Sequence, residues 1–187
     1  MKPTLIWSVL IFTSLVGLCS SVPALAQPVP HDLESRAAMP DWYNKLNGLE
    51  KKYCILNPLN WGVCYKAFKH AEVAYAEAEK KFAKNTLEDG KGDAFRHCYW
   101  NARMAIDIGF QRAKTIADNH ENGIQIKDAD KKGKQKRAMD LKNNDFGRKI
   151  GISFQRSAPK LGKNKWYAQS MTRCGEAARN GELKTLV

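Results

Sequence analysis

The chain has 187 residues and a formal net charge of +12, and 43% of its residues are hydrophobic. This length allows one domain with a single core and is too short for two comfortable domains. The positive charge favours anionic partners such as nucleic acid, lipid headgroups or acidic cell-wall polymers, although a basic surface can equally serve only to keep a protein in solution.

Residues 1–26 are predicted to be a signal peptide. Lys2 gives a positive start, residues 5–18 form an apolar segment, and Ala24-Leu25-Ala26 has the small-x-small form of a signal peptidase site. The apolar segment is too short for a comfortable membrane span. We therefore expect a secreted or periplasmic protein with no stable membrane span after cleavage.

The rest of the chain is expected to form an extended N-terminal arm and one compact helical domain. Residues 27–40 contain three prolines and little periodicity, which is typical of an extended segment. Residues 41–187 have apolar residues at steps of three and four and no alternating strand pattern, so the domain is predicted to be all-α. The expected helices cover 41–54, 61–84, 93–109, 110–121, 139–154 and 166–179.

Two further segments carry structural expectations. The charged run from Lys127 to Arg137 is expected to be a mobile surface loop, because such runs are usually solvated. Gly147 and Gly151 are four residues apart on one predicted helix, and they would allow another helix to approach closely.

Four cysteines remain after signal cleavage, and we predict that they form two disulfides. An even count in an exported chain favours such staples, although four cysteines allow three pairings. Cys54 and Cys64 flank a turn-like Asn-Pro-Leu-Asn segment and are the favoured first pair. Cys98 with Cys174 is then the second pair, which would tie the central motif to the C-terminal region.

The segment Gly92–Asn101 is the centre of the predicted motif core, which covers about residues 88–152. Asp93, His97 and Asn101 are spaced four apart, so they lie on one face of the predicted helix. Trp100 could line a pocket beside this face or pack in the core.

Three polar clusters fall on successive predicted helices and could converge, because short connections favour side-by-side packing. The clusters consist of acidic, amide and imidazole side chains: Asp93, His97 and Asn101; Asp118, Asn119, His120 and Glu121; and Asp140, Asn143 and Asn144. The expected catalytic residues are His97, His120, Glu121 and Asp140. The expected substrate-binding residues are Asp93, Arg96, Trp100, Asn101, Asn143, Asn144 and Arg148.

The residue types leave two mechanisms open. His97 and His120 with Asp140 or Glu121 could hold a divalent metal ion that activates water. Alternatively, His97 acts as general base or nucleophile, oriented by a carboxylate, while Arg96 or Arg148 neutralises developing charge. A structural interpretation also stands, in which these polar groups satisfy one another in a buried network that joins the helices.

Three segments resemble a family of bacterial exported domains of unknown function. They are Gly92-Asp93-Ala94-Phe95-Arg96-His97 with Trp100-Asn101, then His120-Glu121, then Met139-Asp140-x-x-Asn143-Asn144-x-x-Gly147-Arg148. The resemblance supplies no established catalytic residues. The chain is also similar in outline to bacterial secreted phospholipases A2, which are all-α and disulfide-bonded with an Arg-His pair on a helix, but Cys98 follows His97 where those enzymes place a calcium-binding aspartate.

We therefore expect a secreted hydrolase that acts on an anionic substrate, a phosphodiester or a phospholipid, through a His/Asp/Glu/Asn site. The alternative is a non-enzymatic, secreted basic protein that binds a partner, nucleic acid or an acidic surface, and in which the motif is a structural network.

Overall fold

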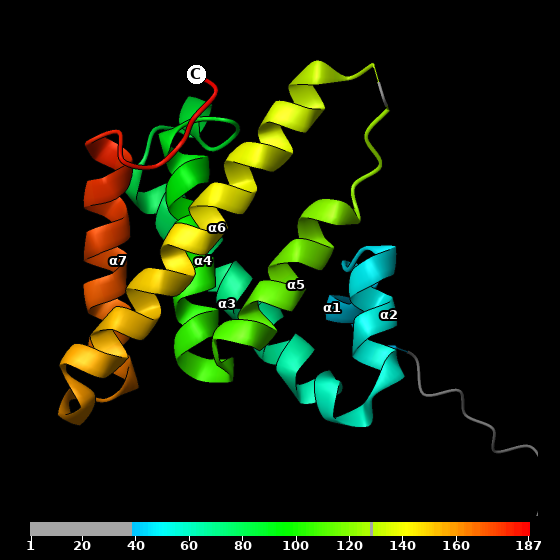
Figure 1. Cartoon of the computed structure of the whole chain (residues 1–187), viewed down its shortest axis with the longest axis horizontal. Coiled ribbons are helices and arrows are strands. Elements are labelled where there is room, and N and C mark those ends of the chain that lie inside the picture. The colour runs from blue at the N-terminus through cyan, green and yellow to red at the C-terminus, as the bar shows by residue number, and fades with distance from the viewer. Residues whose placement is uncertain (1–38, 128) are drawn as a thin grey trace, which may run out of the picture. The chain divides into compact units, whose positions relative to one another are not determined.

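Helix α4, Lys91–Ile108, lies at the centre of the protein and packs against α3, α5, α6 and α7 (Figure 1). The computed structural model describes residues 39–127 and 129–187. The predicted signal peptide 1–26 and most of the predicted arm 27–40 lie outside the described residues. The elements are α1 Asp41–Asn44, α2 Gly48–Leu56, α3 Pro58–Lys81, η1 Lys84–Thr86, α4, α5 Phe110–Asn122, α6 Lys131–Ser157, η2 Pro159–Leu161 and α7 Lys163–Arg179.

The all-α prediction is confirmed, because the described part of the chain contains seven α-helices and no strand. Residues 39–187 form one compact unit. Its core is built from small, aromatic and larger aliphatic side chains, among them Phe95, Met104 and Ala105 of α4. None of the helices in the described ranges has the length and hydropathy needed to cross a membrane.

The first expected helix is interrupted at Asn47, and α1 and α2 are separate. The Asn47 side chain accepts hydrogen bonds from the backbone of Leu49 and Glu50, while Glu50 accepts from the Asn47 N–H. This reciprocal capping box starts α2 afresh. The Asn47 amide also donates to the backbone oxygens of Asn119 and His120, which ties α2 to the end of α5.

The expectation of a loop from Lys127 to Arg137 is wrong over most of its length, because α6 begins at Lys131. The side chain of Asp130 accepts a hydrogen bond from the Gly133 N–H and caps the first turn. Lysine, glutamine and arginine are good helix formers, so a charged run can extend a helix once a cap is in place. The first two turns of α6 therefore carry the basic residues.

Both predicted disulfides are confirmed. Cys54–Cys64 joins α2 to α3, and Cys98–Cys174 joins α4 to α7 across 76 residues of sequence. Both sulfurs of the second pair belong to fully buried residues. The site-bearing helix is thus covalently attached to the last helix of the fold.

Helix α6 packs closely against α4 at its two glycines, and a close approach at these positions is what the glycine spacing predicts. A β-carbon on Gly147 would collide with the backbone of Cys98, and one on Gly151 would lie 2.5 Å from the carbonyl oxygen of Ala102. Two side chains that precede these glycines on α6, Asp140 and Asn144, are brought directly against α4 by this contact.

Candidate functional site

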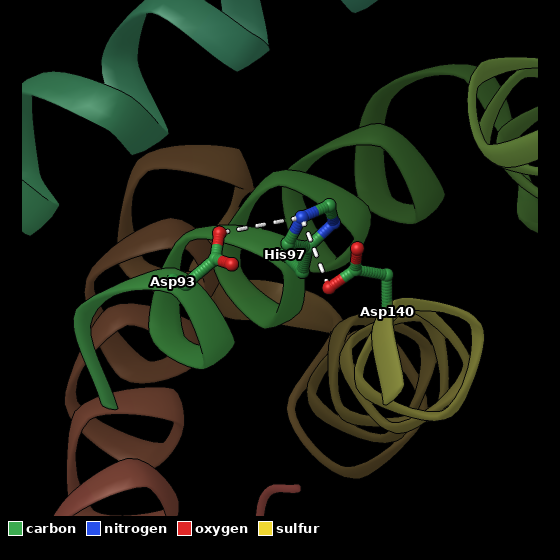
Figure 2. A group of neighbouring side chains, drawn as sticks. All are labelled: Asp93, His97 and Asp140. Atoms are coloured by element: carbon green, nitrogen blue, oxygen red, sulfur yellow. Dashed lines mark ion pairs between the residues drawn. The ribbon is translucent and has the colours of Figure 1, made fainter. Parts of the chain in front are cut away.

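His97 is the centre of a buried polar cluster to which α4, α5 and α6 contribute. Its side chain is 2% exposed, and three carboxylates approach the ring, those of Asp93, Glu121 and Asp140. Figure 2 shows the carboxylates of Asp93 and Asp140 on either side of one ring nitrogen, the first from the same helix and the second from α6. The predicted convergence of the three helices on His97 is therefore present in the structure.

The other ring nitrogen is held by Asn144. His97 Nδ1 lies 3.1 Å from Asn144 Oδ1, which also accepts a 2.6 Å hydrogen bond from Asn101. The Asn144 amide group donates to Glu121 Oε1 at 2.9 Å, so its oxygen faces the imidazole. Because that oxygen can only accept, Nδ1 carries the hydrogen, and Nε2 is left with a lone pair.

The lone pair of Nε2 faces two carboxylate oxygens and the Arg96 guanidinium. Asp93 Oδ1 is 3.5 Å away and Asp140 Oδ1 is 3.4 Å away. Arg96 Nη2 donates to Nε2 at 2.9 Å and to Asp93 Oδ1 at 2.5 Å. A second cation, Lys136, lies 3.9 Å from the other oxygen of Asp93, which accepts from the Asp89 N–H.

The burial of these groups shifts their protonation. Burial, followed by the charge of Arg96, holds the pKa of His97 well below its usual value, so the imidazole is neutral at pH 7. Burial also raises the pKa of Glu121. Burial together with the charges of Glu121 and Asp93 raises the pKa of Asp140 to about 8. In the absence of a further cation, Asp140 therefore carries a proton over much of the neutral range.

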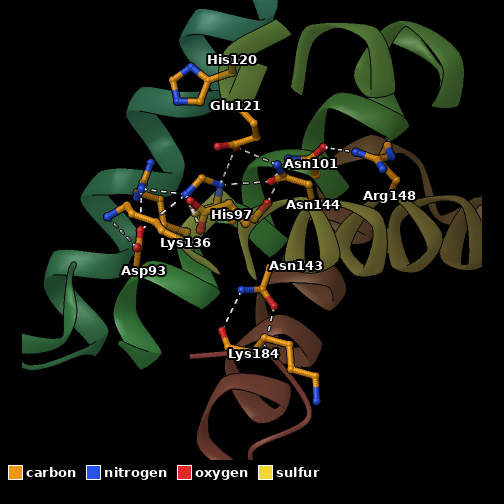
Figure 3. A network of polar contacts seen from close by, with 12 residues as sticks. Asp93, His97, Asn101, His120, Glu121, Lys136, Asn143, Asn144, Arg148 and Lys184 are labelled. Atoms are coloured by element: carbon orange, nitrogen blue, oxygen red, sulfur yellow. Dashed lines mark hydrogen bonds and ion pairs between the residues drawn. The ribbon is translucent and has the colours of Figure 1, made fainter. Parts of the chain in front are cut away.

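Asn101 extends the cluster along the contact between α4 and α6. Its amide group donates to the His97 carbonyl at 3.1 Å, and its oxygen accepts from Arg148 Nη1 at 2.9 Å. Arg148 is itself 2% exposed and lies against the Phe110 ring. Asn101 and Arg148, two predicted substrate-binding residues, thus hold the cluster in position along the contact between α4 and α6 (Figure 3).

Two predicted site residues point away from His97, as Figure 3 shows. Asn143 donates to the Lys184 carbonyl and accepts from the Lys184 N–H, both at 2.9 Å, and so fastens the C-terminal tail to α6. His120 pairs with Glu50 of α2 at 3.1 Å. Burial lowers the pKa of His120, but the hydrogen bond and charge of Glu50 outweigh it and raise this pKa above its ordinary value.

A pocket of about 170 Å³ adjoins the cluster. Most of its wall is apolar and is contributed by α2, α3, α4 and α5, including Tyr53, Phe68, Ala71, Trp100, Ile116 and the Cys54–Cys64 disulfide. Its polar lining comprises Lys45, Glu50, Arg96, Asn119 and His120. Arg96 is therefore shared, because the same side chain lines the pocket and contacts His97.

The predicted residue Trp100 belongs to the pocket wall rather than to the polar cluster. Its indole nitrogen donates to the Ala67 carbonyl at 3.0 Å, and its ring meets the His120 ring edge-on at 5.3 Å. Trp100 thus belongs both to the wall of the pocket and to the hydrophobic core.

Lys136 is the charged neighbour that the sequence reasoning missed, because it falls in the segment expected to be a loop. It binds Asp89 at 2.7 Å and approaches Asp93. The capping pattern of Asp130 with Gly133 was the available signal. A helix from that cap places Lys136 four residues before Asp140, on the same face.

The fold and the site define a disulfide-linked α-helical domain with a buried histidine–carboxylate cluster. Residues 51–179 match the model of the family described as "Domain of unknown function (DUF6973)". The match covers more than half of the chain, so the protein belongs to this family. No curated protein and no solved structure matches the chain significantly.

Proposed function

We propose that the protein is an exported hydrolase that cleaves an anionic ester at the His97 cluster. One observation carries the proposal: a neutral, buried imidazole lies beside two carboxylates, and its Nε2 accepts from Arg96, whose side chain also lines a pocket. Groups with shifted pKa values beside a pocket are typical of catalytic sites.

Arg96 gives the site its expected preference for an anion. Its guanidinium is held at one end by Asp93, while its side chain is 27% exposed and lines the pocket. A phosphate group that enters the pocket would meet this guanidinium, and Arg96 would neutralise the charge that develops when water attacks. Lys45 at the same pocket adds a second positive charge.

The pocket favours a phospholipid over a soluble phosphodiester. Aromatic and aliphatic side chains form most of its wall, and burial of an acyl chain against them would be favourable. In the proposed reaction, the oxygen of water bonds to the ester carbon or phosphorus, the ester C–O or P–O bond breaks, and the released alcohol takes the proton that water loses. The protein atoms beside this reaction are His97 Nε2 and the carboxylates of Asp93 and Asp140.

Export is part of the proposal. Two disulfides persist in oxidising compartments and are rare in the cytosol, which supports a secreted or periplasmic location. The predicted signal peptide supports the same location.

The test is hydrolysis of two probes by the purified chain. Vesicles that contain phosphatidylglycerol report lipid cleavage, and bis(p-nitrophenyl) phosphate reports general phosphodiesterase activity. We expect the wild type to cleave the lipid and His97→Gln to lose at least about 100-fold of that rate. His70→Gln, which changes another buried histidine outside the cluster, should retain it. Absence of cleavage of both probes by the wild type refutes the hydrolase.

A second candidate function is favoured by the extent of the buried hydrogen-bond network around His97. Asn101, Asn144 and Arg148 are buried and bonded to one another or to Glu121, as a purely structural cluster would be. The protein would then bind an anionic surface through its basic groups, including those at the start of α6. Vesicle binding that weakens with salt and survives His97→Gln, without any cleavage, would favour this function.

A further inference from the structure

We propose that Asp93, His97 and Asp140 form a binding site for one divalent cation of the zinc or manganese class. One possible ligand atom from each of the three residues lies within 4.8 Å of the other two, and His97 Nε2 is 3.5 Å from Asp93 Oδ1 and 3.4 Å from Asp140 Oδ1. An ion between them needs distances of roughly 2.0–2.2 Å to nitrogen and oxygen ligands, which small side-chain movements would give. Catalytic zinc sites have such a set of three protein ligands and keep a further coordination position for water.

The orientation of the imidazole supports this assignment. Asn144 fixes the hydrogen on Nδ1, so Nε2 directs its lone pair toward the two carboxylate oxygens. Arg96 bridges Nε2 and Asp93 Oδ1, whereas Asp140 Oδ1 faces the imidazole with no hydrogen-bond donor among the described residues. A metal-binding histidine typically has its second nitrogen hydrogen-bonded in this way, which sets both tautomer and ring direction.

Asp140 provides an independent observation. Its side chain is 4% exposed, and its Oδ1 accepts no hydrogen bond from any residue that the structure describes. A buried carboxylate oxygen without a partner is rare in folded proteins, because it has lost its hydration without replacement. This oxygen is the one that faces His97 Nε2, so the missing partner belongs at the centre of the proposed site (Figure 2).

Arg96 fills part of the site in the present structure. Its Nη2 contacts Asp93 Oδ1 and His97 Nε2, two of the three ligand atoms. Arg96 is also the most exposed member of this group and lines the pocket. Movement of its guanidinium into the pocket would free both atoms and open a route for the ion, and the displaced positive charge would then face an anionic substrate.

The donor set determines the kind of ion. One neutral imidazole and two carboxylates suit zinc, manganese or a similar divalent metal. Calcium prefers six to eight oxygen ligands, and this site offers too few. The inference goes beyond the proposed function, because binding is measured without substrate; only the role of the ion in activating water rests on the hydrolase.

The test uses the full chain after treatment with a chelator, dialysed against ZnCl2, MnCl2 or CaCl2 and assayed for bound metal and melting temperature. We expect one zinc or manganese ion per chain, a higher melting temperature with that ion, and little retention of calcium. In the manganese form, electron spin-echo spectra should show a nitrogen coupling that His97→Gln abolishes.

Three variants make the test specific. Asp140→Asn should weaken binding by at least about 100-fold, because it replaces a carboxylate ligand by an amide of the same size. Asp107→Asn changes a carboxylate elsewhere on α4 and should bind as the wild type does. Arg96→Gln should bind about tenfold more tightly, since no guanidinium has to be displaced.

The proposal is overturned if neither the wild type nor Arg96→Gln retains zinc or manganese. It is also overturned if retained metal is unaffected by Asp140→Asn and His97→Gln. Metal binding without cleavage of lipid or phosphodiester would uphold the site and refute the hydrolase, so the two proposals fail separately.

Discussion

The backbone of Gly147 on α6 rests directly on the carbonyl of Cys98 on α4, with no space for a side chain between them. This contact sets the separation of the two helices. Because Asp140 and Asn144 lie on the same helix and face His97, the separation also sets the dimensions of the polar cluster. A small residue outside the cluster thus controls its geometry.

Gly147→Ala should therefore destabilise the protein by about 3 kcal/mol, because the added methyl group meets backbone that cannot rotate away. The free energy of unfolding in urea measures this. Gly62→Ala on α3 is the matched control: its β-carbon would meet open space, so the variant should gain up to about 1 kcal/mol from helix propensity. Equal effects of the two substitutions would show that α6 shifts freely against α4.

Adjacent asparagines on α6 should have different mutant phenotypes. Asn144→Ala removes the partner of His97, Asn101 and Glu121 in the buried cluster, and it should cost about 3 kcal/mol or more. Asn143→Ala removes two hydrogen bonds to the backbone of Lys184 and should cost about 1–2 kcal/mol. Chemical denaturation measures both losses.

Hydrogen exchange then separates the two variants. The Lys184 amide, which Asn143 Oδ1 holds in the wild type, should exchange faster in Asn143→Ala and remain protected in Asn144→Ala. Fast exchange of this amide in both variants would contradict a local role for Asn143.

His70 should make the protein less stable as the pH falls from 7 to 4. Burial, and then the charge of Arg103, lowers the pKa of His70 to about 4. Arg103 Nε donates to its Nδ1, while its Nε2 faces Asp107 at 3.2 Å. Lys66 lies beside Asp107, and the Tyr167 ring is tilted against the imidazole. The folded pKa is below the unfolded value near 6.5, so the unfolded chain binds more protons between these two values.

The stability from neutral His70 is complete above pH 6.5 and is lost progressively toward pH 4, by about 3 kcal/mol at most. Unfolding free energies of the wild type and His70→Gln, compared at several pH values, isolate this effect from the other titrating groups. The difference between the two proteins should shrink as the pH falls, and a difference that stays constant or grows would refute the role of His70.

The two disulfides should contribute unequally. In the loop-closure picture, Cys98–Cys174 with its separation of 76 residues is worth about 4.5 kcal/mol, whereas Cys54–Cys64 with a separation of 10 is worth about 3 kcal/mol. Paired replacement of each bridge by alanine, followed by guanidinium unfolding, measures these losses. Losses in the reverse order would mean that native packing around each bridge outweighs the entropy of the unfolded chain.

The sequence predicts the fold class and both disulfides, because these follow from spacing within one segment or from simple counting. Short helix connections allow the convergence on His97 but do not require it. Periodicity of three and four identifies a helix face before its partners are known. The glycine pair on α6 likewise indicates a close helix contact without naming the partner. These features need no knowledge of the tertiary arrangement.

Which of two neighbouring residues faces His97 depends on the tertiary arrangement, and the sequence does not predict it. Adjacent residues on a helix point about 100° apart, so only one residue of each pair can reach His97. Glu121 and Asn144 do so, whereas His120 turns to Glu50 and Asn143 to the C-terminal tail. The motif contains both members of each pair, and the sequence does not show which member faces inward.

Helix α4 lacks the solvent-exposed side that most helices of a small protein possess. Beyond its first residue, only Arg96, Arg103 and Asp107 are more than slightly accessible, and each of them holds a specific polar partner. In a saturation mutagenesis of the whole chain, α3 and α7 should therefore show the usual alternation of tolerant and intolerant positions. From Gly92 onward, substitutions along α4 should be poorly tolerated at successive positions. The helix that carries the site should therefore also accept the fewest amino-acid changes.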